Sequence, residues 1–129
     1  MSGDPESPLA AVEDAIAAVG RGEIVVVVDD EDRENEGDLI MAAQHATPED
    51  IAFFVRYTSG VLCAPMTGER LTELALPLMV AVNTEPMRTA YTITVDAAEG
   101  TTTGISAADR SRTLNLLSSP DSEPHDFVR

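Results

Sequence analysis

The chain has few basic residues, little cysteine and no tryptophan, and these shortages exclude several classes of function. Its 129 residues include eight Lys and Arg against 23 Asp and Glu, a formal net charge of −15. Nucleic acid and anionic membranes are therefore not expected as the main partner, because phosphate contacts along them need clustered bases. A small phosphorylated substrate needs only one or two local bases. The single cysteine, Cys63, excludes a disulfide framework and agrees with a reducing cytoplasm.

Long apolar runs are also missing. No run approaches the roughly 20 apolar residues of a transmembrane helix. The acidic start, Met1 to Glu6, has no secretory signal pattern. Aromatic residues make up 4% of the chain, so the core is expected to consist of Val, Leu, Ile and Ala. The length is that of one domain, and we expect a soluble cytoplasmic protein.

Strands and helices alternate along the chain. Residues 1–7 are expected to be flexible, and Ser7 with Pro8 predicts a helix start, with Gly22 closing the helix. Residues 24–28 are apolar throughout and predict a strand buried on both faces. Further strands are predicted at 39–43, 61–64 and 90–96, further helices from Thr47, from Thr67 to Leu76 and from Ser106, and no element after Ser118. This alternation predicts an α/β (α+β) fold, a mixed β-sheet surrounded by helices.

An acidic loop, Asp29 to Asp38, directly follows the first predicted strand. It holds seven acids and one arginine. Like charges at this spacing repel one another, so folding the loop costs free energy unless a metal, a shared proton or a substrate offsets the repulsion. A solvated charged face is the plainer explanation. Arg33 can bind a carboxylate or phosphate through two hydrogen bonds, and Gly37 permits a tight turn.

The spacing does not match an EF-hand calcium loop. If Gly37 were the invariant glycine, the loop would begin at Asp32 and its closing glutamate would fall on Ala43. Mg²⁺ stays compatible with the loop, because this ion commonly uses one or two carboxylates together with water and substrate.

Two long motifs resemble one enzyme family. Asp29 to Asp38 resembles the signature of 3,4-dihydroxy-2-butanone 4-phosphate synthases, and Glu99 to Arg110 resembles a second motif of that family. Shorter segments agree with it, at Tyr57–Cys63, at Leu76–Met79 with Asn83, and at Tyr91–Val95. The resemblance covers nearly the whole chain beyond residue 9.

The resemblance implies a lyase of riboflavin biosynthesis that converts D-ribulose 5-phosphate to 3,4-dihydroxy-2-butanone 4-phosphate and formate. It implies Mg²⁺ or Mn²⁺ as cofactor, and a homodimer with sites near the subunit interface for the complete domain. The substrate is enolised, dehydrated and rearranged, so protons move beside a carbonyl and negative charge builds on oxygen. Crowded carboxylates and a cation suit that chemistry.

By resemblance, the acidic loop supplies most of the site residues. Arg33 and Glu34 contact the substrate, and Glu34 is also a metal ligand. Asp38 contacts the substrate as a catalytic acid or base, and Glu36 is a further catalytic candidate beside it.

Two other residues match family positions near the substrate. Cys63 is a catalytic candidate, although a cysteine in an apolar strand is commonly a small core residue. Thr103 is a substrate-binding candidate, and turn chemistry explains it equally well. Asp109 is interpreted as the last residue of a helix capping box rather than as a catalyst. His45 and His125 match no family ligand and are interpreted as surface residues.

The sequence departs from the family pattern at its end. In the family, the segment matching Asp126 to Arg129 continues into Pro-Gly-His. A histidine that is the other metal ligand, and a catalytically important glutamate, follow later. Residues 8–129 are therefore expected to be the N-terminal portion of a single domain, from a fragment or a naturally shortened relative, without part of the active site. The alternative is a non-catalytic module that binds sugar phosphate or serves assembly.

Overall fold

A computed structural model describes residues 8–129, which form ten short elements. In chain order they are α1 (Val12–Gly20), β1 (Val25–Val28), β2 (Gly37–Ile40), the 3-10 helix η1 (Ala43–His45), α2 (Pro48–Tyr57), α3 (Gly68–Glu73), β3 (Asp96–Ala97), α4 (Ala107–Ser118), the 3-10 helix η2 (Pro124–Asp126) and β4 (Phe127–Val128). The predicted flexible segment 1–7 and the Ser7 cap lie outside the described residues. None of the helices in the described range is long and apolar enough to cross a membrane.

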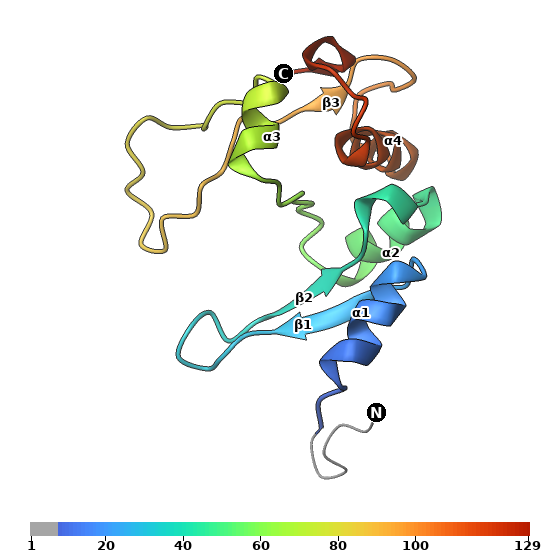
Figure 1. The fold of residues 1–129 in the computed structure, drawn as a ribbon, viewed down its shortest axis with the longest axis vertical. Coiled ribbons are helices and arrows are strands. Elements are labelled where there is room, and N and C mark those ends of the chain that lie inside the picture. Colours follow the sequence, from blue (N-terminus) through green and yellow to red (C-terminus); the bar gives the residue numbers. More distant parts are fainter. Residues whose placement is uncertain (1–7) are drawn as a thin grey trace.

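β1 and β2 form an antiparallel hairpin whose loop is the acidic segment (Figure 1). Val28 pairs with Gly37, so the second strand begins before the predicted residue 39. The prediction of a strand buried on both faces is wrong, since Val26 is 66% exposed and Val28 is 54% exposed. This sheet has two strands within residues 8–129, and it lacks the layers that bury both faces of a central strand.

The start of α2 agrees with the prediction. Thr47 Oγ1 accepts a hydrogen bond from the Asp50 amide (3.2 Å), and Asp50 Oδ2 accepts one from the Thr47 amide (3.0 Å). The two bonds complete a capping box, with Pro48 at the first helical position. Ile51 on the inner face of α2 is 1% exposed. Truncating such a side chain to alanine costs about 2–5 kcal/mol, so Ile51 anchors the helix.

Two predicted helix boundaries are wrong. α1 begins at Val12 rather than at Pro8, and no side chain caps its start. α3 ends at Glu73 rather than at Leu76, because Ala75 adopts a left-handed φ of 54° that the helix cannot continue through.

Two predicted strands are largely absent. Residues 61–64 form no strand, and residues 90–95 contribute one isolated bridge, between Leu78 and Thr92. Both segments have strand-like composition, but a strand needs a partner for its backbone groups. Within residues 8–129, no strand pairs with residues 61–64, and Val61 accordingly is 72% exposed, while residues 90–95 pair only around Leu78.

The segment after Ser118 forms elements that the sequence did not predict. β4 pairs antiparallel with β3, and Phe127 lies opposite Ala97. Phe127 packs with Leu74 and Leu76 in a small apolar core. The partly buried residues around this core are Met66, Leu71, Ile93, Val95, Leu116 and Leu117.

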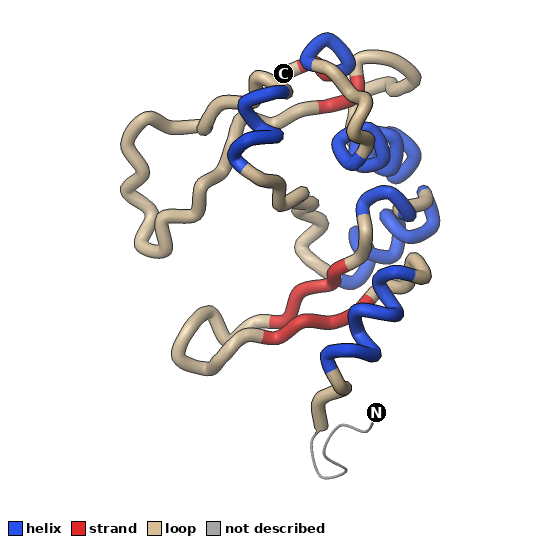
Figure 2. Tube along the Cα trace, in the orientation of Figure 1, coloured by secondary structure: helices blue, strands red, loops and turns tan. Residues whose placement is uncertain are grey.

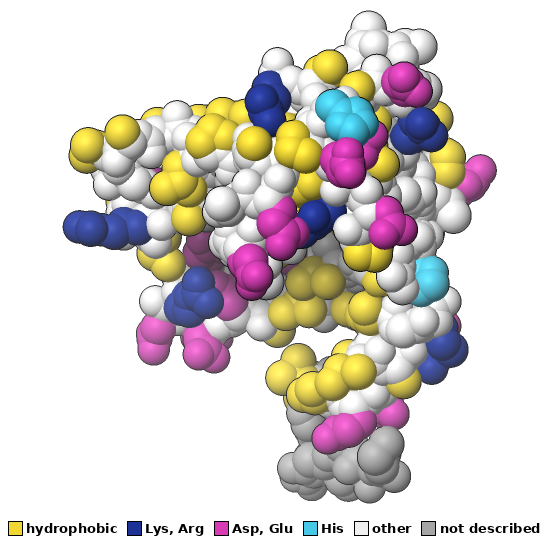
Figure 3. Space-filling model, turned by 45° about the horizontal axis from the view of Figure 1, so that its top comes forward, with side chains coloured by type: hydrophobic (Ala, Val, Ile, Leu, Met, Phe, Trp, Pro, Cys, Tyr) yellow, Lys and Arg dark blue, Asp and Glu magenta, His cyan; other side chains and the backbone are white. Residues whose placement is uncertain are grey.

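The fold class is confirmed as helices with small sheets, although the described strands form two antiparallel pairs rather than one mixed sheet. Figures 1 and 2 show α1, β1 and β2 at one end and α3, β3 and the C-terminal segment at the other, with α2 and α4 between them. The hairpin loop and the long loop after α3 both project on the left of this view. Figure 3 shows apolar side chains in yellow on the surface of the molecule. Among the exposed apolar residues, Val82 is 78% exposed and Met79 is 54% exposed.

Candidate active site

Asp29 organises the acidic loop from within. Its Oδ1 accepts a hydrogen bond from the Glu36 amide and its Oδ2 accepts one from the Glu34 amide, each 2.9 Å long. These amides, that of Glu36 foremost, hold the pKa of Asp29 below its ordinary value of 3.8. Asn35 takes a left-handed φ of 52°, which asparagine tolerates. The loop therefore has a defined backbone although its side chains repel one another.

The predicted site residues of this loop are all exposed, namely Arg33, Glu34, Glu36 and Asp38. Asp38 lies on β2 opposite Val27, and the other three lie in the loop itself. Exposure weakens the repulsion among the carboxylates, because water and salt screen it. Within residues 8–129, no group of three or more His, Cys, Asp or Glu side chains lies close enough to hold a metal ion. The loop thus offers separate carboxylates rather than a finished metal cage.

Cys63 lies in the irregular segment that follows α2, and its thiol is free and exposed. The prediction that it belongs to an apolar strand is wrong, and so is its interpretation as a core residue. The segment begins at Gly60, whose φ of 79° turns the chain after the helix. An exposed thiol is accessible to a ligand, which keeps Cys63 available for chemistry.

The second motif forms a loop, Glu99–Gly104, which is bound to α4 by a buried carboxylate. Asp109 is 5% exposed, and its Oδ2 accepts hydrogen bonds from the Thr102 amide (2.9 Å), the Thr102 hydroxyl (2.8 Å) and the Gly104 amide (3.0 Å). These bonds, those from Thr102 foremost, hold the pKa of Asp109 below its ordinary value of 3.8. Ser106 Oγ caps α4 by accepting a bond from the Asp109 amide (3.0 Å). The predicted capping box is half formed, because the Asp109 carboxylate binds the loop instead.

Thr103 lies between these anchored residues and is exposed. Its neighbours Thr102 and Gly104 make the bonds to Asp109, so the Thr103 hydroxyl stays accessible to a ligand. Gly104 has a φ of 84°, and a Cβ at this position would collide with the Asp96 carboxylate. The backbone conformation therefore favours glycine here, and a Cβ would also force the Asp96 carboxylate to shift.

His45 and His125 are exposed, as predicted. Sequence reasoning missed the structural roles of Asp29 and Arg110. A signal for Asp29 was present, because an aspartate at the end of a strand commonly accepts backbone amides of the following turn. Nothing local indicated the contact of Arg110 with the Gly60 carbonyl, which lies 50 residues earlier in the chain.

The described chain brings some predicted residues together and keeps others apart. The acidic loop projects at the lower left of Figure 1, whereas the Glu99–Gly104 loop follows β3 at the upper right. The segments of Cys63 and Thr103 are joined, because the Arg110 guanidinium donates hydrogen bonds to carbonyl oxygens beside each of them. The predicted site therefore falls into two groups in this chain.

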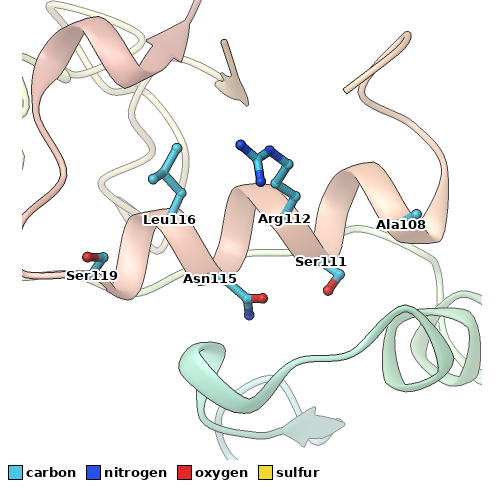
Figure 4. Close-up of a pocket in the computed structure, with 6 residues that line it drawn as sticks. All are labelled: Ala108, Ser111, Arg112, Asn115, Leu116 and Ser119. Carbon is cyan, nitrogen blue, oxygen red and sulfur yellow. The ribbon is translucent and has the colours of Figure 1, made fainter. Parts of the chain in front are cut away.

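A groove of about 340 Å³ along α4 contains none of the predicted residues. Its lining comes from Ala108, Ser111, Arg112, Asn115, Leu116 and Ser119 (Figure 4). Ser111 and Asn115 point toward the segment of η1 and α2, where they donate hydrogen bonds to the Ala46 and Ala43 carbonyls. The groove therefore lies along α4 where this helix contacts the segment of η1 and α2, and none of its lining residues is acidic.

Known proteins are similar to this chain over almost its whole length. The family model described as 3,4-dihydroxy-2-butanone 4-phosphate synthase matches residues 13–129. A protein of that name from Agrobacterium fabrum is 56% identical over 121 residues, which are 94% of this chain and 57% of that protein. The riboflavin biosynthesis protein RibBA of Rhodococcus erythropolis is 58% identical over 119 residues, 92% of this chain and 28% of that protein.

A solved structure has the same fold. The crystal structure of a 3,4-dihydroxy-2-butanone 4-phosphate synthase in complex with two magnesium ions matches with a TM-score of 0.92 and 52% identity. The match covers 94% of this chain and 56% of that one, so this chain spans little more than half the length of such a synthase. Sequence and fold agree over nearly every described residue, and the chain belongs to the 3,4-dihydroxy-2-butanone 4-phosphate synthase family.

Proposed function

We propose that this chain forms the N-terminal part of a lyase that converts D-ribulose 5-phosphate to 3,4-dihydroxy-2-butanone 4-phosphate and formate. The acidic loop carries the proposal, because its backbone is held by Asp29 while the side chains assigned to substrate and metal stay exposed. The family match, which includes this loop, supports the reaction. This chain spans 57% of the Agrobacterium fabrum relative, and we expect the remaining length of such a synthase to supply the rest of the site.

The loop residues suit separate parts of the reaction. Arg33 has a permanent charge and a planar fork of donors, which suits the oxygen atoms of a sugar phosphate. Asp38 and Glu36 can take up and return protons beside the substrate carbonyl, as enolisation and dehydration require. Cys63 and Thr103 form the second group, and the reaction requires both groups to reach one substrate.

Glu34 is the metal ligand that this chain contributes. Carboxylate oxygens are the hard donors that Mg²⁺ and Mn²⁺ prefer, so the donor chemistry of the loop fits either ion. A related synthase was solved with two magnesium ions, which supports the assignment. When bound, such an ion stabilises the negative charge that develops on the substrate oxygens.

The complete domain is proposed to be a cytoplasmic homodimer. Exposed apolar side chains on β1, Val26 to Val28, support a partner surface. The free thiol of Cys63 fits a reducing compartment.

Formate release tests the proposed reaction. This chain, and a version extended after Arg129 with the remaining part of the Agrobacterium fabrum relative, are each incubated with Mg²⁺ and ribulose 5-phosphate. We expect formate from the extended version. Formate from neither version would refute the lyase function.

The metal assignment is tested in the extended version with Glu34→Gln. The neutral amide lacks the ionised oxygens that a hard cation needs, so kcat/KM is expected to fall by more than about tenfold. Glu31→Gln, an exposed acid of the same loop with no assigned role, is the matched control and should keep the original rate. Equal rates for the two variants would mean that Glu34 is not the ligand.

A second candidate function is a non-catalytic module that binds sugar phosphate or serves assembly. It is favoured by the lack, within residues 8–129, of any group of three or more metal-binding side chains. Calorimetry with ribulose 5-phosphate separates the two functions: binding to this chain without formate from either version supports the module.

A further inference from the structure

Arg110 joins the two segments that carry Cys63 and Thr103. Its Nη1 donates a hydrogen bond to the Gly60 carbonyl (2.8 Å), and its Nε donates one to the Ile105 carbonyl (2.8 Å). Gly60 leads into the Cys63 segment, and Ile105 follows the loop that contains Thr103. One side chain therefore bonds to the segments of two candidate site residues, Cys63 and Thr103.

The guanidinium of Arg110 is used for this bridge and for no ion pair in the described chain. The arginine ion pairs within residues 8–129 are those of Arg21 with Glu23 and of Arg70 with Glu73. A guanidinium is always charged and presents its donors in a rigid planar fork, which suits two acceptors at a defined spacing. Hydrogen bonds from a charged donor are also stronger than neutral ones.

The segment after Gly60 has few other attachments. Among residues 8–129, no backbone-to-backbone hydrogen bond involves residues 61–66. The Val61 amide reaches the Ser59 hydroxyl at 3.4 Å, and Met66 packs against the apolar core. Cys63 therefore lies within a span that Arg110 secures at one end and Met66 at the other.

The rest of α4 is attached independently of Arg110. Ser111 Oγ donates to the Ala46 carbonyl (2.8 Å), and Asn115 Nδ2 donates to the Ala43 carbonyl (2.8 Å). These acceptors precede α2, whereas Gly60 follows it. Removing the Arg110 side chain should therefore release the Cys63 segment while α4 stays bound to the region of η1 and α2.

We propose that Arg110 is a positioning residue that holds the Cys63 segment beside the Thr103 loop, so that Cys63 and Thr103 meet one substrate. The functional half of this proposal rests on the proposed lyase function. The mechanical half does not, because the two hydrogen bonds form without substrate.

The single cysteine of the chain allows a direct test. Cys63 is labelled with a trifluoromethyl thiol reagent, and the ¹⁹F chemical shift is compared among the original chain, Arg110→Met and Arg110→Lys. Amide exchange at Gly60 and Val61 is followed by NMR in the same samples. Arg112→Met is the matched control, because Arg112 lies on the same helix and also donates to a carbonyl, that of Glu99.

In Arg110→Met, the label signal is expected to move toward its value in the denatured chain. The two amides are expected to exchange about tenfold faster, because a charge-assisted bond no longer closes the segment. Arg110→Lys keeps the charge without the planar fork and should restore only part of each change. Arg112→Met should leave both measurements at their original values.

An unmoved label with unchanged exchange in a folded Arg110→Met protein would overturn the positioning role. If that variant does not fold, Arg110→Lys decides, and original values in it would equally overturn the role. If Arg110→Met displaces the label in this chain while the unlabelled extended version with the same substitution keeps full kcat, the functional half alone is refuted. Formate from no version would remove the lyase function and leave the mechanical half to the NMR result.

Discussion

The acidic loop and the Glu99–Gly104 loop are each organised by one aspartate, in surroundings that differ sharply. Asp29 accepts hydrogen bonds from two backbone amides inside the hairpin. Asp109 accepts bonds from two backbone amides and a hydroxyl in the loop that precedes its helix. Asp109 is 5% exposed and Thr113 on the same helix is 6% exposed, whereas the acids that follow Asp29 in its loop are exposed.

This contrast separates the motif residues that build a loop from those that stay available to a ligand. In the acidic loop, Asp29 shapes the backbone and the other acids lie in solvent. In the second loop, Asp109 and Gly104 form the structure, and Thr103 stays exposed. Residues that are equally prominent in a motif therefore have different roles, and their hydrogen-bond partners distinguish them.

The strongest test of the contrast is Gly104→Ala in the packed loop. A left-handed φ of 84° and the contact with the Asp96 carboxylate both oppose a Cβ. The free energy of unfolding, measured with urea, is expected to fall by about 2–4 kcal/mol, from backbone strain plus overpacking. Gly68→Ala in α3 is the matched control, because a Cβ there meets open space. Equal stability of both variants would show that the loop is not rigidly packed.

Acid should affect both loops, and the buried one more. The pKa values of Asp29 and Asp109 are held below 3.8, so each carboxylate stabilises the fold above that pH, and the stabilisation is lost as the pH falls through the lowered pKa. We expect the melting temperature to fall as the pH drops below the ordinary aspartate pKa of 3.8. Asp109→Asn should reduce the dependence of the melting temperature on pH more than Asp29→Asn does. A larger reduction in Asp29→Asn would mean that the buried carboxylate is not the more important of the two.

The smallest expected effect is that of Val27→Thr on β1. Val27 is 47% exposed, and threonine keeps the branched shape, so the free energy of unfolding should change by less than about 0.5 kcal/mol. Chemical denaturation at several protein concentrations measures it. A decrease in the free energy of unfolding that depends on protein concentration would instead indicate that a second copy of the chain covers the hairpin.

The starts of α2, α3 and α4 were predictable because their interactions are local, whereas the start of α1, which has no side-chain cap, was misplaced. Thr47, Thr67 and Ser106 each accept a hydrogen bond from the amide three residues ahead, and all three were recognised as caps. The strand predicted at 61–64 failed for the opposite reason. Its apolar composition suits a strand, but pairing depends on a distant partner that the described chain does not provide.

In the candidate site, too, the sequence identified residues but not their surroundings. Arg33, Glu34, Glu36 and Asp38 were chosen from the motif, and their exposure in a shaped loop agrees with ligand binding without testing their roles. Cys63 was misplaced because its surroundings depend on neighbours that spacing does not reveal.

The sequence alone determined the family, the helix caps and the acidic loop, because these follow from residue types at fixed covalent spacing. Tertiary structure decided which aspartate shapes each loop, why a side chain is disfavoured at Gly104, and that Arg110 bonds a carbonyl 50 residues earlier in the chain. It also decided that the valines of β1 are exposed. Each of these outcomes depends on which surfaces meet after folding. A backbone carbonyl is chemically the same at every position, so the sequence around Gly60 carries no local sign of its partner.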